Sequence, residues 1–326
     1  MRCLISKSHN PWFNLASEEY FLRHNSEELF ILYINEPCIV VGKHQNLYSE
    51  INYNFSRKNS IKLARRISGG GTVYQDLNNL NFSFIHNCAN RDQINFTKFT
   101  MPILEALREM GIDVEFSGRN DLLINSEKIS GNAMHIFKNR VLSHGTLLFN
   151  ANLDQLSMAL KNNDNRYLDK SIKSVRSKVT NISPYLSSIE TVECFTDLIF
   201  EHILSKDETS LAQSLEAFEE QEINKLAKEK FETWEWIYGY SPKYVYKNTF
   251  KFGKCIINVE FSVERGLISN TRIITHPKDY EIEGQLCKIL NGTLHDFKTI
   301  EMKLRDISIN NSLLTYKLSD YCNQLF

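Results

Sequence analysis

Three consecutive glycines between two apolar runs constrain this chain most. Gly69, Gly70 and Gly71 follow directly on Arg65-Arg66-Ile67-Ser68. Glycine allows positive φ angles and close approach of the backbone to a ligand, and successive exposed N–H groups can form an anion-binding nest. The apolar run 61–67 predicts a strand, and 72–74 predict the start of another. We therefore expect a strand–loop–strand cradle for a carboxylate or phosphate, with a flexible turn as the alternative.

Composition limits the classes of partner. The chain has 326 residues, 42% of them hydrophobic, and a formal net charge of −1. That length suffices for one large and one small domain, and that charge predicts no general attraction to nucleic acid or to a membrane surface. Basic residues gather locally, beside the glycines and again in 170–178. The first group favours an anionic small-molecule ligand.

Cysteine usage and the absence of long apolar runs indicate a cytoplasmic protein. The seven cysteines are widely spaced and include no C-x-x-C pair, which argues against a disulfide framework or a structural zinc site. The first residues lack the pattern of a signal or transit peptide. No run is long and apolar enough to span a membrane.

The hydrophobic pattern predicts an α+β chain of antiparallel hairpins and segregated helices. Strands are expected over 29–34, 38–42, 80–85, 113–116, 122–124, 128–135, 141–149, 249–252, 255–263 and 267–275. Helices are expected over 49–58, 100–110, 153–160, 189–204, 209–231, 280–290 and 296–304, with Thr100 as the N-cap of the second. The segment 239–243 (GYSPK) is the predicted boundary, and it divides the chain into domains 1–240 and 246–326.

Two further segments make the glycine run specific. Gly118-Arg119-Asn120-Asp121-Leu122 precedes Lys128-Ile129-Ser130-Gly131-Asn132-Ala133. Together with the glycine run they resemble the lipoate–protein ligase A family, whose marks are R-R-x-S-G-G-G-x-V, G-R-N-D-L and K-[IV]-S-G-x-A. Four more segments resemble the family in the same order: 11–16 (PWFNLA, followed by Glu18 and Glu19), 144–148 (HGTLL), 174–181 (SVRSKVTN) and 234–236 (WEW). The last precedes the small C-terminal domain of the two-domain bacterial type.

The resemblance implies a fold and an activity. The fold would be the catalytic domain shared by biotin and lipoate ligases, with mixed, mainly antiparallel sheets, plus a small C-terminal α+β domain. The activity would be ATP-dependent activation of lipoate to lipoyl-AMP with Mg²⁺, followed by transfer of the lipoyl group to a lysine of lipoyl domains. Acceptors would be the E2 subunits of 2-oxoacid dehydrogenases and the glycine-cleavage H protein, and octanoate would be a second acyl substrate.

The chemistry explains why such residues are needed. A carboxylate is a poor acylating agent, so it must first be joined to AMP with release of pyrophosphate. An enzyme then has to hold carboxylate and α-phosphate together with fixed cations and N–H donors. A lysine, as a compact charge with rotatable donors, suits a group that changes from carboxylate to mixed anhydride.

The resemblance also assigns residues. Lys128 would contact the lipoyl carbonyl and the phosphate as the catalytic residue, although a surface lysine on a hairpin is the alternative. The remaining residues of the predicted substrate and adenylate site are Arg66, Ser68, Gly69, Gly70, Gly71, Val73, Tyr74, Asn79, Asp121, Gly131, Ala133, His144 and Arg176.

Three of these assignments have structural alternatives. Asp121 can help to hold Mg²⁺, which prefers oxygen ligands, or can be a structural carboxylate. His144 can act as a base for the incoming lysine or be a satisfied core histidine. Arg176 and Lys178 can belong to a lid that excludes water from the adenylate, or to a solvated basic loop.

The chain departs from the family pattern at three positions. Gln75 and Asn78 stand where the family's H-D-x-G-N segment has histidine and glycine. Asn78 tolerates a left-handed backbone, but Gln75 cannot titrate. His135 replaces an arginine that the ligases often carry.

Because of these departures, a second function stays open: a lipoyltransferase that uses only preformed lipoyl-AMP. An octanoyltransferase is a further alternative. A cysteine-dependent octanoyltransferase is disfavoured, since no cysteine flanks Lys128 or His144. Biotin ligase is disfavoured by the missing G-R-G-R-x-G loop. A catalytically inactive binding module is the rival from another class.

Overall fold

The structure is a computed structural model that describes residues 1–88, 96–118, 121–160, 165–252, 255–308 and 318–326. The chain forms two compact units, each built from segments that are far apart in the sequence. Unit 1 contains Met1–Lys43, Ile61–Met158 and Ser174–Thr233. Unit 2 contains His44–Ser60, Ala159–Lys173 and Trp234–Phe326.

Unit 1 is organised by a six-stranded, mainly antiparallel sheet. Only its β13–β1–β2 part is parallel. In spatial order the strands are β10 (Asn132–Phe137), β11 (Arg140–Leu148), β6 (Asn79–Asn87), β2 (Leu29–Ile34), β1 (Arg2–Ile5) and β13 (Leu211–Ala212).

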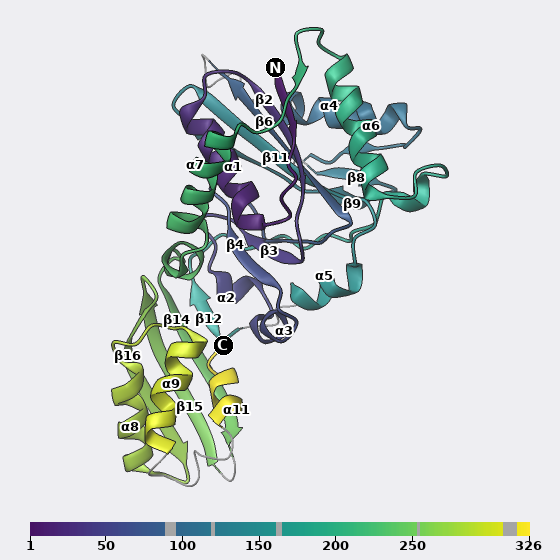
Figure 1. The fold of residues 1–326 in the computed structure, drawn as a ribbon. Coiled ribbons are helices and arrows are strands. Elements are labelled where there is room, and N and C mark those ends of the chain that lie inside the picture. The colour runs from purple at the N-terminus through teal and green to yellow at the C-terminus, as the bar shows by residue number, and fades with distance from the viewer. Residues whose placement is uncertain (89–95, 119–120, 161–164, 253–254, 309–317) are drawn as a thin grey trace. The chain divides into compact units, whose positions relative to one another are not determined.

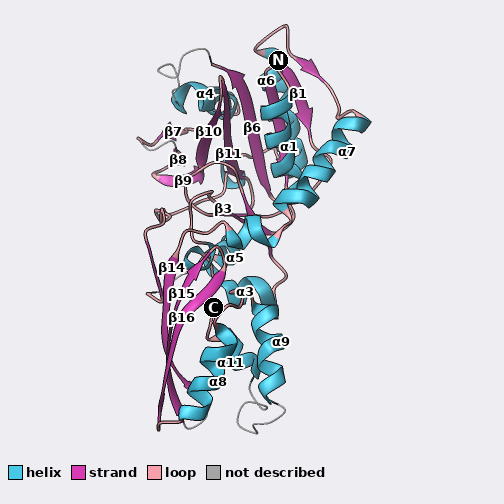
Figure 2. Cartoon of the chain, turned by 90° about the vertical axis from the view of Figure 1, so that its left-hand side faces the viewer, coloured by secondary structure: helices cyan, strands magenta, loops and turns pink. Residues whose placement is uncertain are grey.

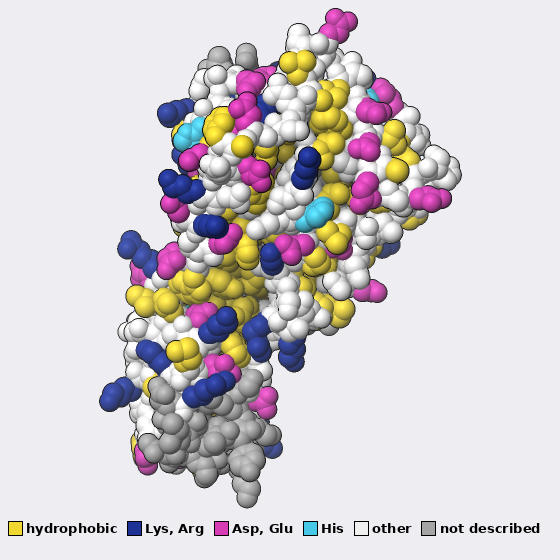
Figure 3. Space-filling model, viewed as in Figure 1, with side chains coloured by type: hydrophobic (Ala, Val, Ile, Leu, Met, Phe, Trp, Pro, Cys, Tyr) yellow, Lys and Arg dark blue, Asp and Glu magenta, His cyan; other side chains and the backbone are white. Residues whose placement is uncertain are grey.

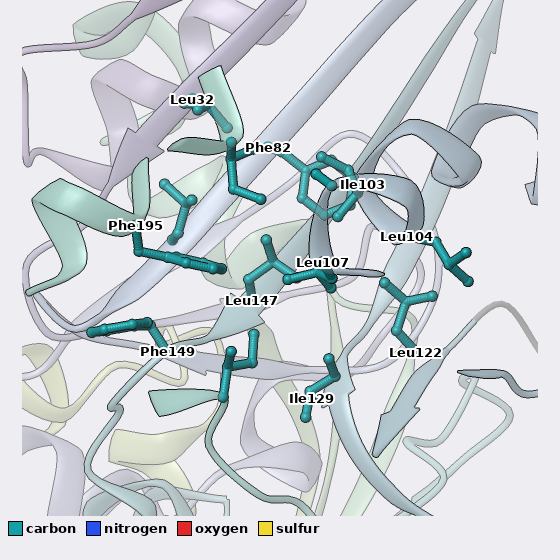
Figure 4. Packing of buried hydrophobic residues seen from close by; sticks show 14 of the residues in the cluster. Leu32, Phe82, Ile103, Leu104, Leu107, Leu122, Ile129, Leu147, Phe149 and Phe195 are labelled. Atoms are coloured by element: carbon teal, nitrogen blue, oxygen red, sulfur yellow. The ribbon is translucent and has the colours of Figure 1, made fainter. Parts of the chain in front are cut away.

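Helices cover both faces of this sheet (Figures 1 and 2). One face carries α1 (Pro11–His24) and α7 (Ala217–Leu226), and the other carries α4 (Phe96–Glu109) and α6 (Val192–Ser205). Under α4 and α6 the strands contribute the large apolar side chains of the core. Leu147 of β11 packs there with Leu107 of α4 and Phe195 of α6, all three fully buried (Figure 4). Burial of such side chains is the main stabilising term for this unit.

Two small sheets complete unit 1. The first contains β4 (Lys62–Arg65), β3 (Cys38–Val41) and β5 (Val73–Gln75) in that order. The second contains β7 (Glu115–Phe116), β8 (Leu122–Ile124) and β9 (Glu127–Ser130). Asn125 and Ser126 join β8 to β9 with φ angles of 50° and 64°, as a tight hairpin turn requires.

Unit 2 is a second α+β body. Its sheet contains β12 (Tyr167–Asp169), β14 (Tyr244–Phe252), β15 (Cys255–Glu264) and β16 (Leu267–His276), all antiparallel. The helices α8 (Tyr280–Leu290) and α9 (Phe297–Ser308) lie along one face of it (Figure 2). The unit also contains α2 (Leu47–Glu50), α3 (Tyr53–Lys58) and α11 (Leu318–Asn323).

An aromatic cluster around His295 forms the core of unit 2. Tyr48 packs 4.9 Å from the His295 ring and donates a hydrogen bond to the His295 carbonyl. Tyr244 and Leu325 bond the two ring nitrogens. Tyr167 stacks on Tyr48 with ring centroids 6.3 Å apart. The segments 44–60 and 159–173 therefore belong to this core by side-chain packing.

The structure confirms the α+β class and corrects several element boundaries. Helix α4 begins at Phe96, so Thr100 is a buried residue within it and not its N-cap. The predicted helix 209–231 is wrong in its first part, where β13 pairs with β1, and α7 ends in a π-helical turn (Ala227–Phe231). The predicted helix 49–58 is two short ones, and the predicted strand 128–135 breaks at Gly131. The predicted helix 153–160 is α5 (Leu153–Ala159).

Charged side chains of both signs lie on the face shown in Figure 3, with Asp and Glu prevailing at its upper right and Lys and Arg along its left edge. None of the helices in the described ranges is long and apolar enough to cross a membrane.

His295 predicts a pH-dependent stability of unit 2. Burial lowers the pKa of His295 from 6.5 to about 4. Between those values the unfolded chain binds more protons than the folded one, so stability falls as the pH drops from 6.5 to 4. At about 1.4 kcal/mol per pKa unit, we expect a loss of about 3 kcal/mol, which would be absent in His295→Gln. Urea unfolding of both proteins across this range measures the difference, and equal pH slopes would contradict it.

Candidate active site

The glycine loop is framed by the small sheet β4–β3–β5. Strand β3 pairs with β4 on one side, Val41 opposite Arg65, and with β5 on the other, Val40 opposite Val73. The chain therefore leaves β4, passes across the end of β3 through residues 66–72, and returns along its other edge. This is the strand–loop–strand arrangement that the sequence predicts, with β3 between its two strands.

Arg66 holds the loop from inside. Its side chain is 6% exposed, and burial lowers the pKa of its guanidinium to about 10 while the charge of Glu18 opposes the shift. Nη2 donates to the carbonyls of Gly69 (2.6 Å) and Gly71 (2.7 Å), and Nε donates to Ser68 Oγ (3.0 Å). These donors turn the loop carbonyls toward the protein interior.

The loop N–H groups are left for a ligand. In the described part of the chain, the N–H groups of Gly69, Gly70 and Gly71 donate no hydrogen bond. Gly70 has φ +87°, and a Cβ there would lie 3.0 Å from Arg66 Nη2. A left-handed glycine between unspent N–H groups is the geometry of an anion-binding nest.

Ser68, at the start of the loop, is tied to a buried histidine and carboxylate. Ser68 Oγ lies 2.6 Å from His144 Nε2. His144 Nδ1 lies 2.9 Å from both carboxylate oxygens of Glu18. Tyr33 Oη and Ser83 Oγ also donate to Glu18. Both ring nitrogens of His144 are therefore engaged within the protein.

Strands β10 and β11 bring two other predicted residues to the loop. Ala133 pairs with His144 across these strands, and a Cβ on Gly70 would lie 3.7 Å from the Ala133 Cβ. The glycine after His144 is also explained: a Cβ on Gly145 would overlap Asn132 and lie 2.6 Å from Phe82 Cζ. The K-I-S-G-N-A and H-G-T segments thus pack against each other and against the loop.

Lys128 and Asp121 form an ion pair. The Nζ and Oδ1 atoms are 2.9 Å apart, and both side chains are partly exposed, at 24% and 21%. A Cβ on Gly131 would lie 3.1 Å from Lys128 Nζ, so glycine leaves room for this side chain. Arg119 and Asn120, from the same predicted segment as Asp121, lie outside the described residues.

The segment 174–180 connects the loop to Lys128. Ser174 Oγ accepts from the Thr72 N–H and would touch a Cβ on Gly71. Further on, Lys128 N–H donates to the Lys178 carbonyl, and Thr180 N–H donates to the Lys128 carbonyl. Arg176 lies between these anchors and is exposed.

Three more of the predicted or departing positions are buried, whereas Val73 is not. Tyr74 is buried and donates to Gln155. Asn79 is fully buried and donates to Asn81. Gln75 accepts from Asn35, so its amide joins a structural network. Val73 on β5 is partly exposed.

His135 does not replace the charge of an arginine. Burial is the main cause that lowers its pKa, and the neighbouring positive charge of Lys43 adds to the effect. Both favour the neutral imidazole at neutral pH. The neighbouring positive charges are those of Lys43 and Arg23, and Arg23 pairs with the buried Glu19.

The described residues hold no ready-made cluster of metal ligands, and the thiol on the strand beside the loop is buried. No group of three or more His, Cys, Asp or Glu is placed there to hold a metal. Cys38, on β3 beside the loop, is buried, and desolvation raises the pKa of its thiol. The structure therefore offers no thiolate nucleophile at this strand.

Sequence reasoning missed Glu18, Lys43 and Ser174. Glu18 was noted only as part of a helix motif, because carboxylates are seldom fully buried. In the structure α1 (PWFNLASEEYFLRH) buries most of its positions, the polar Asn14, Ser17, Glu18 and Glu19 included, and the local sequence does not reveal this burial. Lys43 N–H donates to the Ser68 carbonyl, a backbone contact without a sequence signature.

Comparison with known proteins places these features in a family. Residues 10–228 match the family described as "Lipoyl protein ligase A/B catalytic domain". Residues 241–323 match the family described as "Bacterial lipoate protein ligase C-terminus". The chain is 41% identical over 305 residues to lipoate–protein ligase 1 of Staphylococcus aureus strain Mu50, covering 92% of both chains.

Two solved structures share the fold. One is the LipL1 protein of P. falciparum in complex with lipoate, with a TM-score of 0.63, 24% identity and coverage of 99% of this chain and 100% of that one. The other is a lipoate–protein ligase A bound with ATP, with a TM-score of 0.60, 25% identity and coverage of 73% and 98%.

Gly70 and Gly69 offer a matched pair of substitutions. Gly70→Ala must place a side chain at positive φ and against Arg66, so we expect a loss of about 1–2 kcal/mol in the free energy of unfolding. Gly69→Ala meets nothing within 4 Å and should leave stability unchanged or slightly higher. Urea unfolding without ligand measures both, and equal effects would contradict the left-handed loop.

Proposed function

The chain belongs to the lipoate–protein ligase family, and from this premise we propose how its own residues carry out the ligation. The protein is a lipoate–protein ligase, which activates lipoate with ATP to lipoyl-AMP and transfers the lipoyl group to a lysine of a lipoyl domain. Support comes from relatives of that name that match most of the chain.

The observation that carries the proposal is the glycine loop, whose carbonyls face the protein interior and whose N–H groups are left for a ligand. In the first step a lipoate oxygen attacks the α-phosphorus of ATP and pyrophosphate leaves. Negative charge grows on the phosphorus oxygens, and the N–H groups of Gly69, Gly70 and Gly71 are positioned to bind it without reorganisation. Arg66 acts indirectly, because its donors are spent on the loop carbonyls.

Lys128 is the proposed catalytic cation. Its Nζ pairs with Asp121 and its side chain remains partly exposed, so it can turn toward the mixed anhydride. There it would stabilise charge on both the lipoyl carbonyl and the phosphate. Ala133 leaves space for the adenine ring beside the loop.

Mg²⁺ is proposed to arrive with the nucleotide. It usually binds through one or two carboxylates and the substrate phosphates, so the single carboxylate of Asp121 is a sufficient protein ligand. Bound there, Mg²⁺ would neutralise phosphate charge. Asp121 also orients Lys128, so the residue serves both partners.

In the second step the ε-amine of the acceptor lysine attacks the lipoyl carbonyl, AMP leaves, and the proton lost by the amine passes to the departing AMP phosphate. His144 is not the base in this proposal, because both its nitrogens are engaged. It belongs instead to the support of the loop. The exposed Arg176, between the two anchors of segment 174–180, is placed to cover the adenylate and exclude water.

The acceptors we propose are E2 subunits of 2-oxoacid dehydrogenases and the glycine-cleavage H protein. The location we propose is the cytoplasm, since all seven cysteines are free thiols. We retain 1–240 and 246–326 as functional domains, with substrate chemistry in the first.

Lipoylation by Lys128→Ala tests the proposal. An apo lipoyl domain is incubated with enzyme and either lipoate plus Mg·ATP or preformed lipoyl-AMP, and intact mass spectrometry follows the adduct. We expect wild type to modify the domain in both tubes and Lys128→Ala to lose at least about 100-fold in rate, since it removes the fixed cation. Lys225→Ala, an exposed lysine on α7, is the control and should match wild type.

The two tubes separate the alternatives. An adduct only from lipoyl-AMP would mean a lipoyltransferase that cannot activate lipoate. An adduct from neither would contradict the ligase function for these substrates.

A further inference from the structure

Glu18 is a fully buried carboxylate, and its contacts have a direction. Oε1 accepts from Tyr33, from Ser83 and from His144, whereas Oε2 lies against His144 Nδ1. A buried carboxylate is costly unless its oxygens are bonded. A carboxylate can only accept hydrogen bonds. The nitrogen of His144 that faces Glu18, Nδ1, must therefore carry a proton.

This choice decides the state of Ser68. With the proton on Nδ1, a neutral His144 presents a lone pair at Nε2, and Ser68 can donate its hydroxyl proton there. Ser68 Oγ then accepts from Arg66 Nε. With the proton on Nε2, Ser68 would receive two donors, and its own proton would have to turn to the Gly69 carbonyl. That carbonyl lies 3.5 Å away and already accepts from Arg66.

We propose that Glu18 is a positioning residue of the ligation reaction, which acts through the tautomer of His144 on Ser68 and keeps the glycine N–H groups directed at the anionic acyl adenylate. The inference rests on the proposed function of the loop. Glu18 itself touches no substrate in this account.

Glutamine at position 18 has nearly the same size as glutamate but can present a hydrogen-bond donor to His144 where glutamate presents an acceptor. Its oxygen would take over the bonds from Tyr33 and Ser83, and its NH₂ would face His144 Nδ1. The proton of His144 would then move to Nε2. Glu19→Gln is the matched control, because Glu19 is the adjacent buried carboxylate but pairs with Arg23 and Lys230.

The first measurement is ¹⁵N NMR of the imidazole nitrogens in the full chain, with the signals of His144 identified by their loss in His144→Gln. We expect the proton on Nδ1 in wild type and Glu19→Gln, and on Nε2 in Glu18→Gln. A wild-type His144 with its proton on Nε2 overturns the proposal, even if Glu18→Gln proves too unstable to purify.

The second measurement is a double-mutant cycle on kcat/KM for lipoylation. Substitution of a residue that orients a site from outside typically lowers activity about 10- to 100-fold. We therefore expect Glu18→Gln to lower kcat/KM by about that factor. In a Ser68→Ala background the same substitution should cost little more, because the path through Ser68 is already cut. If the double variant instead loses the product of the two single-variant factors, the proposal is overturned and Glu18 has only a structural role.

The two proposals fail separately. A wild-type enzyme that does not lipoylate would contradict the function, while the tautomer would still be decided by NMR. A wild-type enzyme that lipoylates, with Glu18→Gln unchanged in rate and tautomer, would contradict only the role of Glu18.

Discussion

One guanidinium group organises the site. Arg66 is buried, and its donors reach two carbonyls and a hydroxyl of the loop that follows it. A buried charge is tolerated only when such bonds replace water. The loop is therefore stable only in the conformation that gives its carbonyls to Arg66, and its N–H groups necessarily face the other way. Binding of an anion costs little reorganisation because the loop is already set.

The sheets provide the frame on which that loop depends. Strand β3 holds both ends of the loop, and β11 presents His144 to Ser68. Helix α1 closes the arrangement, because Glu18 points from it into the strands. The same face of the sheet therefore carries the histidine, the small Ala133 and the carboxylate. The packing of α1 on the sheet and the orientation of the loop therefore depend on each other.

The sequence was sufficient for those parts of the site that have local signatures. Three adjacent glycines predicted the loop. The two segments that follow predicted Asp121 and Lys128 as site residues, and the structure places their charged atoms 2.9 Å apart. Glu18 escaped prediction because its role depends on strands that follow it by many residues. The prediction for Thr100 failed for the opposite reason. Thr100 fits a local capping pattern, but α4 begins four residues earlier, at Phe96. Tertiary packing decided both cases.

The interleaved construction of unit 2 has a consequence for how it can form. Tyr48 donates a hydrogen bond to the backbone of His295, a residue 247 positions later in the sequence. Contacts of such long range are slow to close, since chain entropy must be lost before they contribute. During synthesis, residues 44–60 and 159–173 emerge long before the strands that bury them. They must wait on the ribosome with tyrosines exposed, so this enzyme should gain more from chaperones than a protein whose C-terminal body is contiguous in sequence.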